Sequence, residues 1–348
     1  MELRGYIDLL SKQGLLLRVA REVDCRLELG KIARECRSPV LFESLKGYPG
    51  WRIFTNGLCE GSLIGVALGL PPGTTSNEIA QELRARKSSL IRPCLVTTGP
   101  VFENVETAGV DLTRLPIPHW SPLDGGRYLG TWHINITRDP ENGSRNVGVY
   151  RMELLNSRQA SVSTSPNSHL GLHVAKAEKM GRPLPMAVAI GVSETTMMAA
   201  AAGVSGVDEL ELAGALQGEP LRLVKCKTIE LEVPADSEVV IEGFIRTAER
   251  VQDGPYLDYA GATNTNPNAF LFEATGLTYR NDPIFRGTSI GQPGAEDHQL
   301  FAALADVGLV DFHGRPTKQR LQNFLLRRRC FEAFQLVGRL GNPFRGIF

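Results

Sequence analysis

Residues 131–155 read TWHINITRDPENGSRNVGVYRMELL. Apolar and polar residues alternate on both sides of PENG (residues 140–143), whose Pro, Asn and Gly are typical of a reverse turn. The stretch therefore predicts a β-hairpin. It also marks the point from which the sequence becomes rich in strands.

The second strand of this hairpin carries a polar side chain on each face. Asn146 and Arg151 are five residues apart, so a regular strand would point them to opposite sides of the sheet. An Arg among apolar strand residues needs an anionic partner when it is buried. The alternative is a surface strand with a solvated Arg151, and the pattern alone favours that alternative.

Strand-like segments continue after the hairpin and leave room for few helices. The expected strands are residues 159–165, 185–191, 221–228, 229–235, 237–247 and 270–280. The expected helices are HLGLHVAKAEKMG (169–181) and VDELELAGALQG (207–218). Many strands with few helices predict a barrel-like sheet, because closing a sheet removes its exposed edges.

The first hundred residues instead mix helices with short strands. Helical spacing is found in residues 3–14, 26–36 and 76–89, the last with Ser76 as the expected N-cap. Short strands are expected at residues 15–20, 39–44 and 51–56. The segment LTRLPIPHWSPLDGG (112–126) is rich in Pro and Gly and indicates a linker or rim loop.

The fold class predicted from these segments is α+β. We expect an N-terminal mixed α/β domain (1–115), a barrel-like domain (116–300) and a basic helical tail (301–348). The tail has helically spaced apolar residues, and residues 314–348 carry eight Lys or Arg and one acid, Glu332. A docking helix for the parent domain or for a second subunit is the favoured interpretation, and binding to an anionic surface is the alternative.

Composition narrows the functional classes. Lys and Arg together number 38 and so do Asp and Glu, so the whole chain has no nucleic-acid footprint. The six cysteines include no CxxC pair, which argues against zinc ribbons and favours a cytoplasmic protein with reduced thiols. The N-terminus does not resemble a signal peptide, and no apolar run reaches the ~18 residues of a membrane span.

Common catalytic motifs are missing from the sequence. No Walker A sequence or G-x-G-x-x-G fingerprint occurs. His169 and His173 could share one helix face, but the Glu of H-E-x-x-H is missing, so a metalloprotease is discounted. Glu209 lies beside the small residues Ala213 and Gly214, which suggests close backbone approach, although a solvated helical face is favoured on pattern alone.

The stretch DGPYLDYAG (253–261) places two carboxylates five residues apart around a Gly-Pro pair. Asp, Gly and Pro are ordinary turn residues, so the stretch is compatible with a simple chain reversal. It is equally compatible with Asp253 and Asp258 facing one site, where one carboxyl group handles a proton. The residues themselves leave both interpretations open.

Four long stretches in the same order resemble the UbiD-like decarboxylases: residues 145–155, 166–191, 208–243 and 253–261. The similarity extends over roughly residues 1–300. It implies a split β-barrel domain that binds prenylated FMN, with a divalent metal at the flavin phosphate. The implied reaction is the non-oxidative decarboxylation of an aromatic or α,β-unsaturated carboxylic acid, or its reversal as a carboxylation.

The resemblance also assigns cofactor and metal residues. It makes Asn146, His169 and Glu209 the metal ligands and part of the cofactor site. Val149 and Tyr150 would contact the cofactor largely through their backbone. Three further residues fall where the family surrounds the isoalloxazine and phosphate: Ser168, Leu170 and Gly171. An amide, an imidazole and a carboxylate suit Mn²⁺ or Mg²⁺, and K⁺ is a further candidate ion.

The catalytic residues implied by the resemblance are Arg151, Asp253 and Asp258. Arg151 would hold the substrate carboxylate and also bind the cofactor region. Asp258 would protonate the carbon that loses CO₂, from a dry pocket, while Asp253 would pair with Arg151. The family usually has Glu where this chain has Asp253, so the contact with Arg151 is expected to be longer, water-bridged or shifted.

A second departure from the family concerns length. Family members usually continue through a further α/β domain, whereas only the basic tail follows residue 300 here. The resemblance therefore predicts a short member that lacks most of that domain and completes its site as a homo-oligomer or with a partner subunit. A flavin-binding subunit without turnover is the alternative. A flavin prenyltransferase is the expected cofactor supplier, and the individual acid stays open.

Overall fold

The computed structural model describes residues 1–202, 204, 206–259, 261–291 and 295–309. Met1–Val310 form one compact unit. Most of the predicted tail, 301–348, lies outside the described residues, and so do the amphipathic helices expected there. Whether the boundary at residue 115 separates two domains stays a prediction.

The N-terminal elements surround a four-stranded sheet with the order β1-β2-β3-β16. These elements are α1 (Leu3–Lys12), β1 (Leu17–Val23), α2 (Glu28–Glu35), β2 (Val40–Leu45), β3 (Arg52–Thr55), α3 (Gly61–Ala67) and α4 (Ser76–Lys87). The fourth strand, β16 (Ile284–Arg286), lies more than 200 residues later in the sequence and pairs with β3 in parallel. The sheet is therefore completed by a strand that local sequence patterns could not assign to it.

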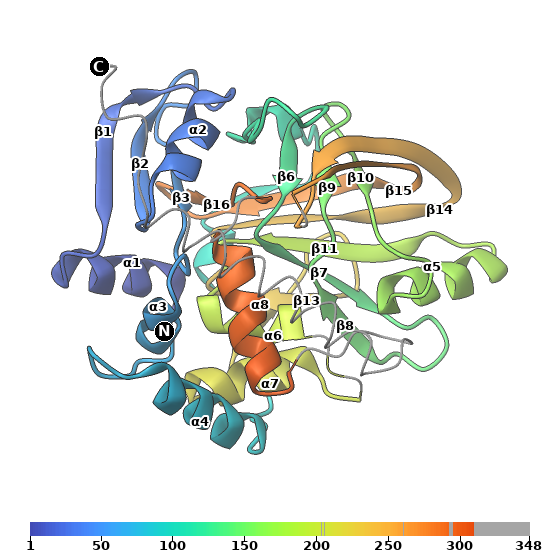
Figure 1. The fold of residues 1–348 in the computed structure, drawn as a ribbon. Coiled ribbons are helices and arrows are strands. Elements are labelled where there is room, and N and C mark those ends of the chain that lie inside the picture. Colours follow the sequence, from blue (N-terminus) through green and yellow to red (C-terminus); the bar gives the residue numbers. More distant parts are fainter. Residues whose placement is uncertain (203, 205, 260, 292–294, 310–348) are drawn as a thin grey trace. The chain divides into compact units, whose positions relative to one another are not determined.

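A seven-stranded antiparallel sheet forms the second layer and curls into a half-barrel (Figure 1). Its strands are β5 (Asn104–Glu106), β7 (His133–Arg138), β8 (Arg145–Gly148), β10 (Gln159–Val162), β11 (Leu184–Ile190), β14 (Val239–Leu257) and β15 (Thr263–Tyr279). The long strands β14 and β15 bend most strongly and pass several register shifts. The predicted α+β fold with a curled sheet is confirmed.

Shorter pieces complete the described chain. Two small sheets have the orders β13-β12-β4 and β6-β9. Their strands are β4 (Cys94–Leu95), β6 (Tyr128–Gly130), β9 (Met152–Glu153), β12 (Arg222–Lys225) and β13 (Glu232–Pro234). The remaining helices are α5 (His169–Lys179), α6 (Glu194–Ala202), α7 (Glu209–Gln217), α8 (Glu296–Asp306) and the 3-10 turns Pro100–Phe102 and Leu112–Arg114.

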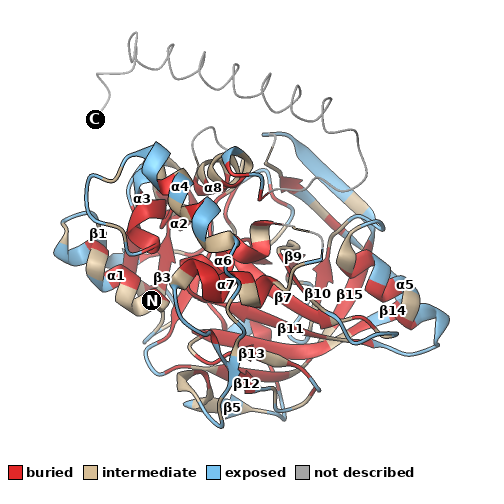
Figure 2. Ribbon diagram, turned by 90° about the horizontal axis from the view of Figure 1, so that it is seen from below, coloured by how far each residue is buried: buried red, intermediate tan, exposed pale blue. Residues whose placement is uncertain are grey.

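Strand β11, in the middle of the curled sheet, is buried on both faces. In β11, Ala187 and Ala189 belong to the core that includes α6 and α7, whereas Met186 and Val188 belong to the core that includes α5. Figure 2 shows this burial as continuous red through β7, β11 and α7. Alternation of inward and outward residues is therefore weak in β11, because each side meets a helix layer.

Two details of the predicted helices need correction. The N-cap of α4 is Thr75 rather than Ser76: the Thr75 hydroxyl accepts from the Glu78 N–H, and the Glu78 carboxylate accepts from the Thr75 N–H in return. Helix α6 was not predicted at all. Eight of its nine residues are buried, so it shows no apolar stripe from which a helix could be recognised.

The hairpin of residues 131–155 is present, but its second strand is shorter than predicted. β8 pairs with β7 only as far as Gly148, which lies opposite Asn135. Val149, Tyr150 and Arg151 form a bend before β9 begins at Met152. The expectation of regular alternation from Asn146 to Arg151 is therefore wrong after Gly148.

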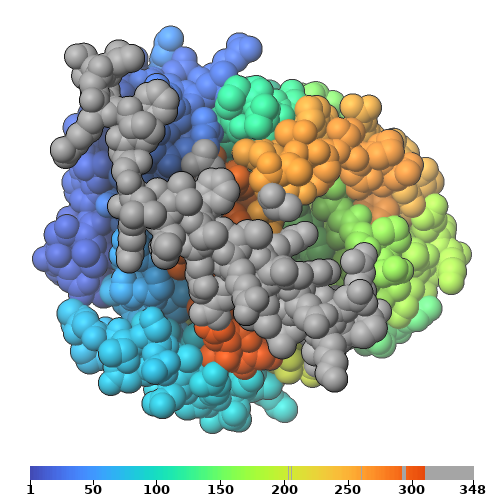
Figure 3. Space-filling model, in the orientation of Figure 1, coloured from blue at the N-terminus to red at the C-terminus, as the bar shows by residue number. Residues whose placement is uncertain are grey.

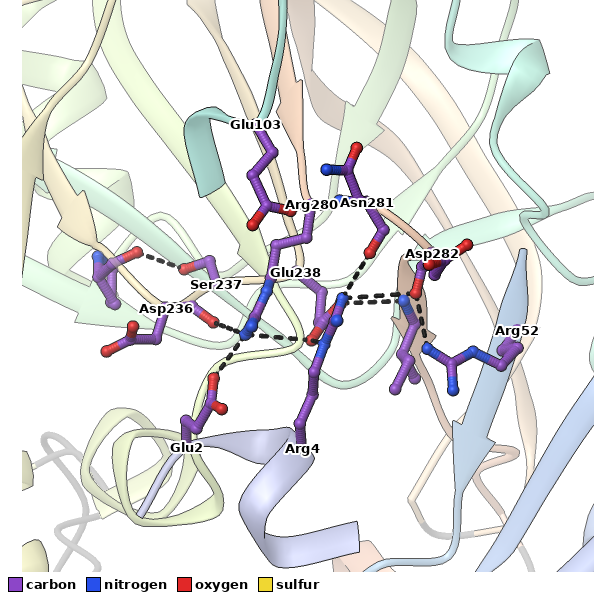
Figure 4. A network of polar contacts seen from close by, with 12 residues as sticks. Glu2, Arg4, Arg52, Glu103, Asp236, Ser237, Glu238, Arg280, Asn281 and Asp282 are labelled. Atoms are coloured by element: carbon purple, nitrogen blue, oxygen red, sulfur yellow. Dashed lines mark hydrogen bonds and ion pairs between the residues drawn. The ribbon is translucent and has the colours of Figure 1, made fainter. Parts of the chain in front are cut away.

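A buried ion-pair network fastens helix α1 to the curled sheet (Figure 4). The Glu238 side chain is fully buried, and Arg4 donates to it from both Nε (2.7 Å) and Nη2 (2.8 Å). Arg280 approaches the same carboxylate at 3.5 Å, and the Ile284 N–H donates to it at 3.0 Å. This network, which we call the Glu238 anchor, links the N-terminal helix to the strands on both sides of the β15–β16 connection.

Candidate active site

Arg151 leaves the bend after β8 and meets Asp253 in β14. Arg151 Nε donates to Asp253 Oδ1 at 2.6 Å, and Nη2 forms an ion pair with the same oxygen. Asp253 is 0% exposed, and its second oxygen accepts from the Ser161 hydroxyl at 2.7 Å. The predicted pairing is present, but the expected lengthening is not, because the long Arg side chain reaches the shorter carboxylate directly.

The remaining terminal nitrogen of Arg151 faces the open side. Nη1 donates to the Oδ1 atom of Asn264 at 2.7 Å, and Asn264 is exposed at the start of β15. The guanidinium also lies over the Tyr256 ring, 4.7 Å from its centre. One end of Arg151 is thus fixed by a buried carboxylate, while the other end is held by an amide that solvent or a ligand can reach.

Asp258 follows β14 and starts the turn toward β15. Its backbone N–H donates to the Ala262 carbonyl (2.9 Å), and its side chain accepts from the Ala262 N–H (3.2 Å) and from Asn264 Nδ2 (2.7 Å). The DGPYLDYAG stretch therefore contains both a strand and a turn, and the turn lies after Leu257 rather than at Gly-Pro. Asp258 is only half-buried in the described chain, not enclosed in a dry pocket.

Asn264 joins the two predicted acids into one network. Its amide oxygen accepts from Arg151, and its amide nitrogen donates to Asp258. The polar path therefore runs from Asp253 through Arg151 and Asn264 to Asp258. The sequence analysis missed Asn264, because an Asn in TNTNPNAF has no motif or periodicity that separates it from an ordinary loop residue.

The rim loop expected at residues 112–126 forms hydrogen bonds with the DGPYLDYAG stretch. Asp124 accepts from the Leu257 N–H at 2.9 Å, and the Gly125 N–H donates to the Pro255 carbonyl at 2.6 Å. Burial raises the pKa of Asp124 above its ordinary value. In Figure 3 the surface of this loop (teal) adjoins the orange surface of the β14–β15 hairpin. The loop thus fixes the end of β14 from which Asp258 projects.

A second group of predicted residues meets around the Tyr150 hydroxyl. That hydroxyl lies 3.4 Å from Asn146 Nδ2 and 3.5 Å from Oδ1, and it also lies beside the Ser168 side chain and the Leu170 N–H. Burial raises the pKa of Tyr150, so the hydroxyl keeps its proton near neutral pH. The structure therefore brings the end of β8 together with the start of α5.

Glu209 approaches the same place from α7. It is 5% exposed, and its Oε2 atom accepts from the Val147 N–H at 3.1 Å, one residue beyond Asn146. Burial raises the pKa of Glu209 to about 7, and the nearby Arg145 guanidinium offsets that rise only in part.

His169 is the first residue of α5 and is half-buried. The helix is capped by Ser168, whose hydroxyl accepts from the Gly171 N–H at 3.0 Å. A Cβ at Gly171 would lie 2.5 Å from the Ser165 carbonyl oxygen, so only Gly fits this approach. The Leu170 and Gly171 N–H groups at the start of α5 thus lie against the Tyr150 and Ser168 hydroxyls, and an anion at this positive end of the helix would compete with those hydroxyls for them.

The residues present fit a phosphate with a divalent ion. The donor set would be an amide, an imidazole and a carboxylate, which is a mostly hard set that leaves room for phosphate oxygens. Among the residues that the structure describes, no three His, Cys, Asp or Glu side chains cluster as a metal site. The predicted set has only two such residues, His169 and Glu209, because its third member is the amide Asn146.

Two stretches of the chain match models of known protein families. Residues 95–293 match the model of the 3-octaprenyl-4-hydroxybenzoate carboxy-lyase Rift-related domain, and residues 7–83 match that of the corresponding N-terminal domain. The chain belongs to the UbiD family. The resemblance stated from the sequence is thus confirmed, and both the Arg151–Asp253 pair and the Asn146–Glu209 region lie within the matched UbiD domain.

Two relatives of this UbiD-family chain have assigned activities. It is 33% identical over 330 residues to pyrrole-2-carboxylic acid decarboxylase of Pseudomonas aeruginosa, covering 89% of this chain and 66% of the relative. It is 33% identical over 308 residues to phenolic acid decarboxylase of Bacillus subtilis, covering 85% of this chain and 65% of the relative. The chain thus spans just under two thirds of the length of these relatives.

Solved structures give the same family assignment. The UbiD-class enzyme HmfF from Pelotomaculum thermopropionicum, an evolved dimeric form in complex with prFMN, matches with a TM-score of 0.80 and 32% identity over 88% of this chain and 70% of that one. Vanillic acid decarboxylase of Sedimentibacter hydroxybenzoicus in its closed form matches with a TM-score of 0.84 and 29% identity, over 87% and 67%. These matches agree with the curled-sheet fold described above.

No helix in the described part of the chain has both the length and the apolar character needed to cross a membrane.

Proposed function

We propose that this chain is a prenylated-FMN-dependent decarboxylase of an aromatic or α,β-unsaturated carboxylic acid. The observation that carries the proposal is the divided role of Arg151, which is fixed by buried Asp253 at one end and bound to exposed Asn264 at the other. A guanidinium held in this way can exchange the amide for a carboxylate. The relatives that decarboxylate pyrrole-2-carboxylic, phenolic and vanillic acids support the reaction class.

The cofactor would occupy the region between the bend after β8 and the start of α5. Asn146, His169 and Glu209 would hold Mn²⁺ or Mg²⁺ at its phosphate, and the capped start of α5 would face the phosphate itself. When bound, prenylated FMN supplies the electron sink that loss of CO₂ requires. The structure of HmfF in complex with prFMN supports this choice of flavin.

The substrate carboxylate would replace Asn264 on Arg151 Nη1. Because the same Asn264 amide also donates to Asp258, its displacement would expose Arg151 Nη1 to the substrate and break the Asn264–Asp258 hydrogen bond in one movement. Substrate binding and the surroundings of the proposed proton donor would thus be coupled through Asn264.

Asp258 would then complete the reaction. The bond between the substrate carbon and its carboxylate breaks, CO₂ leaves, and Asp258 gives a proton to the carbon that carried the carboxylate. Asp258 is half-buried, so solvent can restore its proton after each turnover. The same groups run in reverse would carboxylate the product, and the proposal covers both directions.

The full chain co-expressed with a flavin prenyltransferase tests the proposal. We expect a yellow protein that releases CO₂ from pyrrole-2-carboxylate, a hydroxycinnamate or vanillate. Asp258→Asn should keep the flavin and lose turnover by roughly 10²–10⁴-fold, the usual contribution of a general acid. Full activity of that variant would contradict the role of Asp258.

The assembly needed for activity is part of the proposal. We propose that a second copy or a partner subunit completes the site in the cytoplasm, and the dimeric form of the similar enzyme HmfF supports an assembly. Native mass spectrometry of the purified yellow protein would report flavin, metal and oligomer together. Bound flavin with no CO₂ release from any of the three acids would instead favour a flavin-holding subunit without turnover.

A further inference from the structure

The bend that carries Arg151 is held by side chains instead of a backbone ladder. β8 stops pairing with β7 at Gly148, so the Tyr150 peptide groups have no strand partner. The Tyr150 N–H donates to Asn135 Oδ1 at 3.1 Å, and the Tyr150 carbonyl lies 3.1 Å from His133 Nε2. Two side chains of β7 thus replace the two ladder hydrogen bonds that β8 would have made.

The protonation state of His133 follows from its partner. A carbonyl oxygen can only accept, so Nε2 must carry the proton. His133 is completely buried, and burial lowers its pKa to about 4, so the ring is neutral near pH 7. The ring also needs the glycine at position 130, because a Cβ there would lie 2.5 Å from His133 Cε1.

Both side chains are costly choices for this position. His133 and Asn135 are each 0% exposed in an otherwise apolar part of the sheet. His133 Nδ1 has no hydrogen-bond partner among the described residues, and Asn135 Nδ2 faces only the weakly accepting sulfurs of Met152 (3.2 Å) and Met186 (3.8 Å). Apolar residues would be less costly to bury. The shortest hydrogen bond that the structure records for each side chain is the 3.1 Å one with the Tyr150 peptide.

We propose that His133 and Asn135 are positioning residues that set the direction of Arg151. The inference rests on the proposed function, because it assigns Arg151 to the substrate carboxylate. Fixing both polar groups of Tyr150 determines where the Arg151 backbone begins, and the Arg151 carbonyl is fixed in turn by the Ser163 N–H at 3.0 Å. The Arg151 side chain therefore starts from a fixed backbone position that directs its guanidinium toward Asp253.

The variants His133→Leu, Asn135→Ala and His133→Gln test this proposal, with Ile136→Ala as a control on the same strand. The Gln amide keeps a donor near the position of Nε2, whereas Ile136 is fully buried but makes no contact with Tyr150 that the structure records. Turnover is compared in flavin-saturated protein, with saturation checked by flavin fluorescence, because Tyr150 is also a predicted cofactor residue. Turnover should fall by on the order of 10²-fold in His133→Leu and Asn135→Ala, as expected for a displaced catalytic group. His133→Gln should recover most of it.

Combination with Arg151→Ala separates positioning from general stability. If His133 acts through Arg151, His133→Leu should add little to the loss of pyrrole-2-carboxylate binding already caused by Arg151→Ala. Equal losses in both backgrounds, or a loss as large in Ile136→Ala, would overturn the proposal.

An NMR measurement decides the question without any activity. In protein labelled with ¹⁵N-arginine, the Arg151 Nε–H bonded to Asp253 should give a downfield resonance that disappears in His133→Leu and returns in His133→Gln. If the parent protein binds no carboxylate, the proposed function fails, and this resonance still tests the positioning role. An Arg151 signal unchanged in His133→Leu would refute the inference.

Discussion

Two buried carboxylates, Glu238 and Asp253, each pair with an arginine, but the two pairs are built differently. Both carboxylates are 0% exposed. Arg4 gives Nε and Nη2 to Glu238, and Nη2 also reaches the Asn281 carbonyl at 2.9 Å, so its recorded partners are a carboxylate and backbone (Figure 4). Arg151 instead gives Nη1 to the exposed side chain of Asn264.

This difference distinguishes an ion pair that stabilises the fold from one that can bind a ligand. Arg4 donates to the buried Glu238 carboxylate and to backbone carbonyls, which no side-chain rotation can remove. Loss of any of these partners would therefore cost stability. Asn264 can leave Arg151 by a side-chain rotation alone, because it lies on the surface. A buried ion pair therefore indicates function here only where one of its donors ends on a replaceable partner.

Arg151→Ala should produce the largest effect on activity, and it should also lower stability, because buried Asp253 would keep the Ser161 hydroxyl but lose its charged partner. Loss of a buried charge partner that holds a substrate carboxylate costs about 2–5 kcal/mol of transition-state binding, or roughly 30- to 5,000-fold in kcat/KM. Steady-state CO₂ release by the reconstituted protein measures it. Retention of full kcat/KM would remove the distinction between the two arginines.

Acid should weaken the support of Arg151, because it protonates the buried ring of His133. The pKa of His133 is lowered by burial from 6.5 to about 4, so between these values the unfolded state binds more protons than the folded state. Stability from the neutral ring is thus complete above about pH 6.5 and is lost as the pH falls toward 4, by roughly 3 kcal/mol in total. Urea unfolding of the parent and His133→Gln across this range should diverge; parallel curves would contradict the burial argument.

Arg4→Ala should act on stability and not on chemistry. Buried Glu238 would keep Arg280 and the Ile284 N–H but lose its bidentate partner, at a cost of about 2–3 kcal/mol. The urea midpoint should fall, while kcat of the folded, flavin-loaded protein should stay within about twofold of the parent. A large drop in kcat at unchanged stability would place the anchor in the site.

Asn264→Ala should give the smallest effect and the most diagnostic one. Removing the amide that competes for Arg151 should lower KM by a few-fold, whereas Asp258 would lose an orienting donor and kcat should fall up to about tenfold, the range of a single hydrogen bond. KM and kcat measured together test this split. A rise in KM would show that Asn264 binds the substrate instead of yielding to it.

The fold class could be read from the sequence because hairpin and strand patterns are local. Helix α6 could not, since burial on all sides removes the periodicity that identifies a helix. The end of β8 at Gly148 was also missed. The residues Val149 and Tyr150 continue an alternating pattern, and only the tertiary hydrogen bonds to His133 and Asn135 show that the strand has ended.

The candidate site was predicted through its named residues but not through their links. Resemblance supplied Arg151, Asp253 and Asp258, and the contact between the first two is direct in the structure. Asn264, which joins them to Asp258, belongs to no motif and becomes significant only when β14 and β15 pair. A polar residue that links two others cannot be recognised from its distance along the sequence, because the link depends on distances in the folded structure.

The strand β16 has a consequence for how the chain is made. It completes a sheet whose other strands lie within the first 55 residues, and Arg52 bonds to the Asp282 carbonyl 230 positions away. During synthesis, the edge of β3 therefore stays unpaired until β16 has left the ribosome, near the end of the described chain. A nascent chain in this state exposes an unpaired strand for many seconds at ordinary elongation rates, so chaperone demand should be concentrated on the N-terminal sheet.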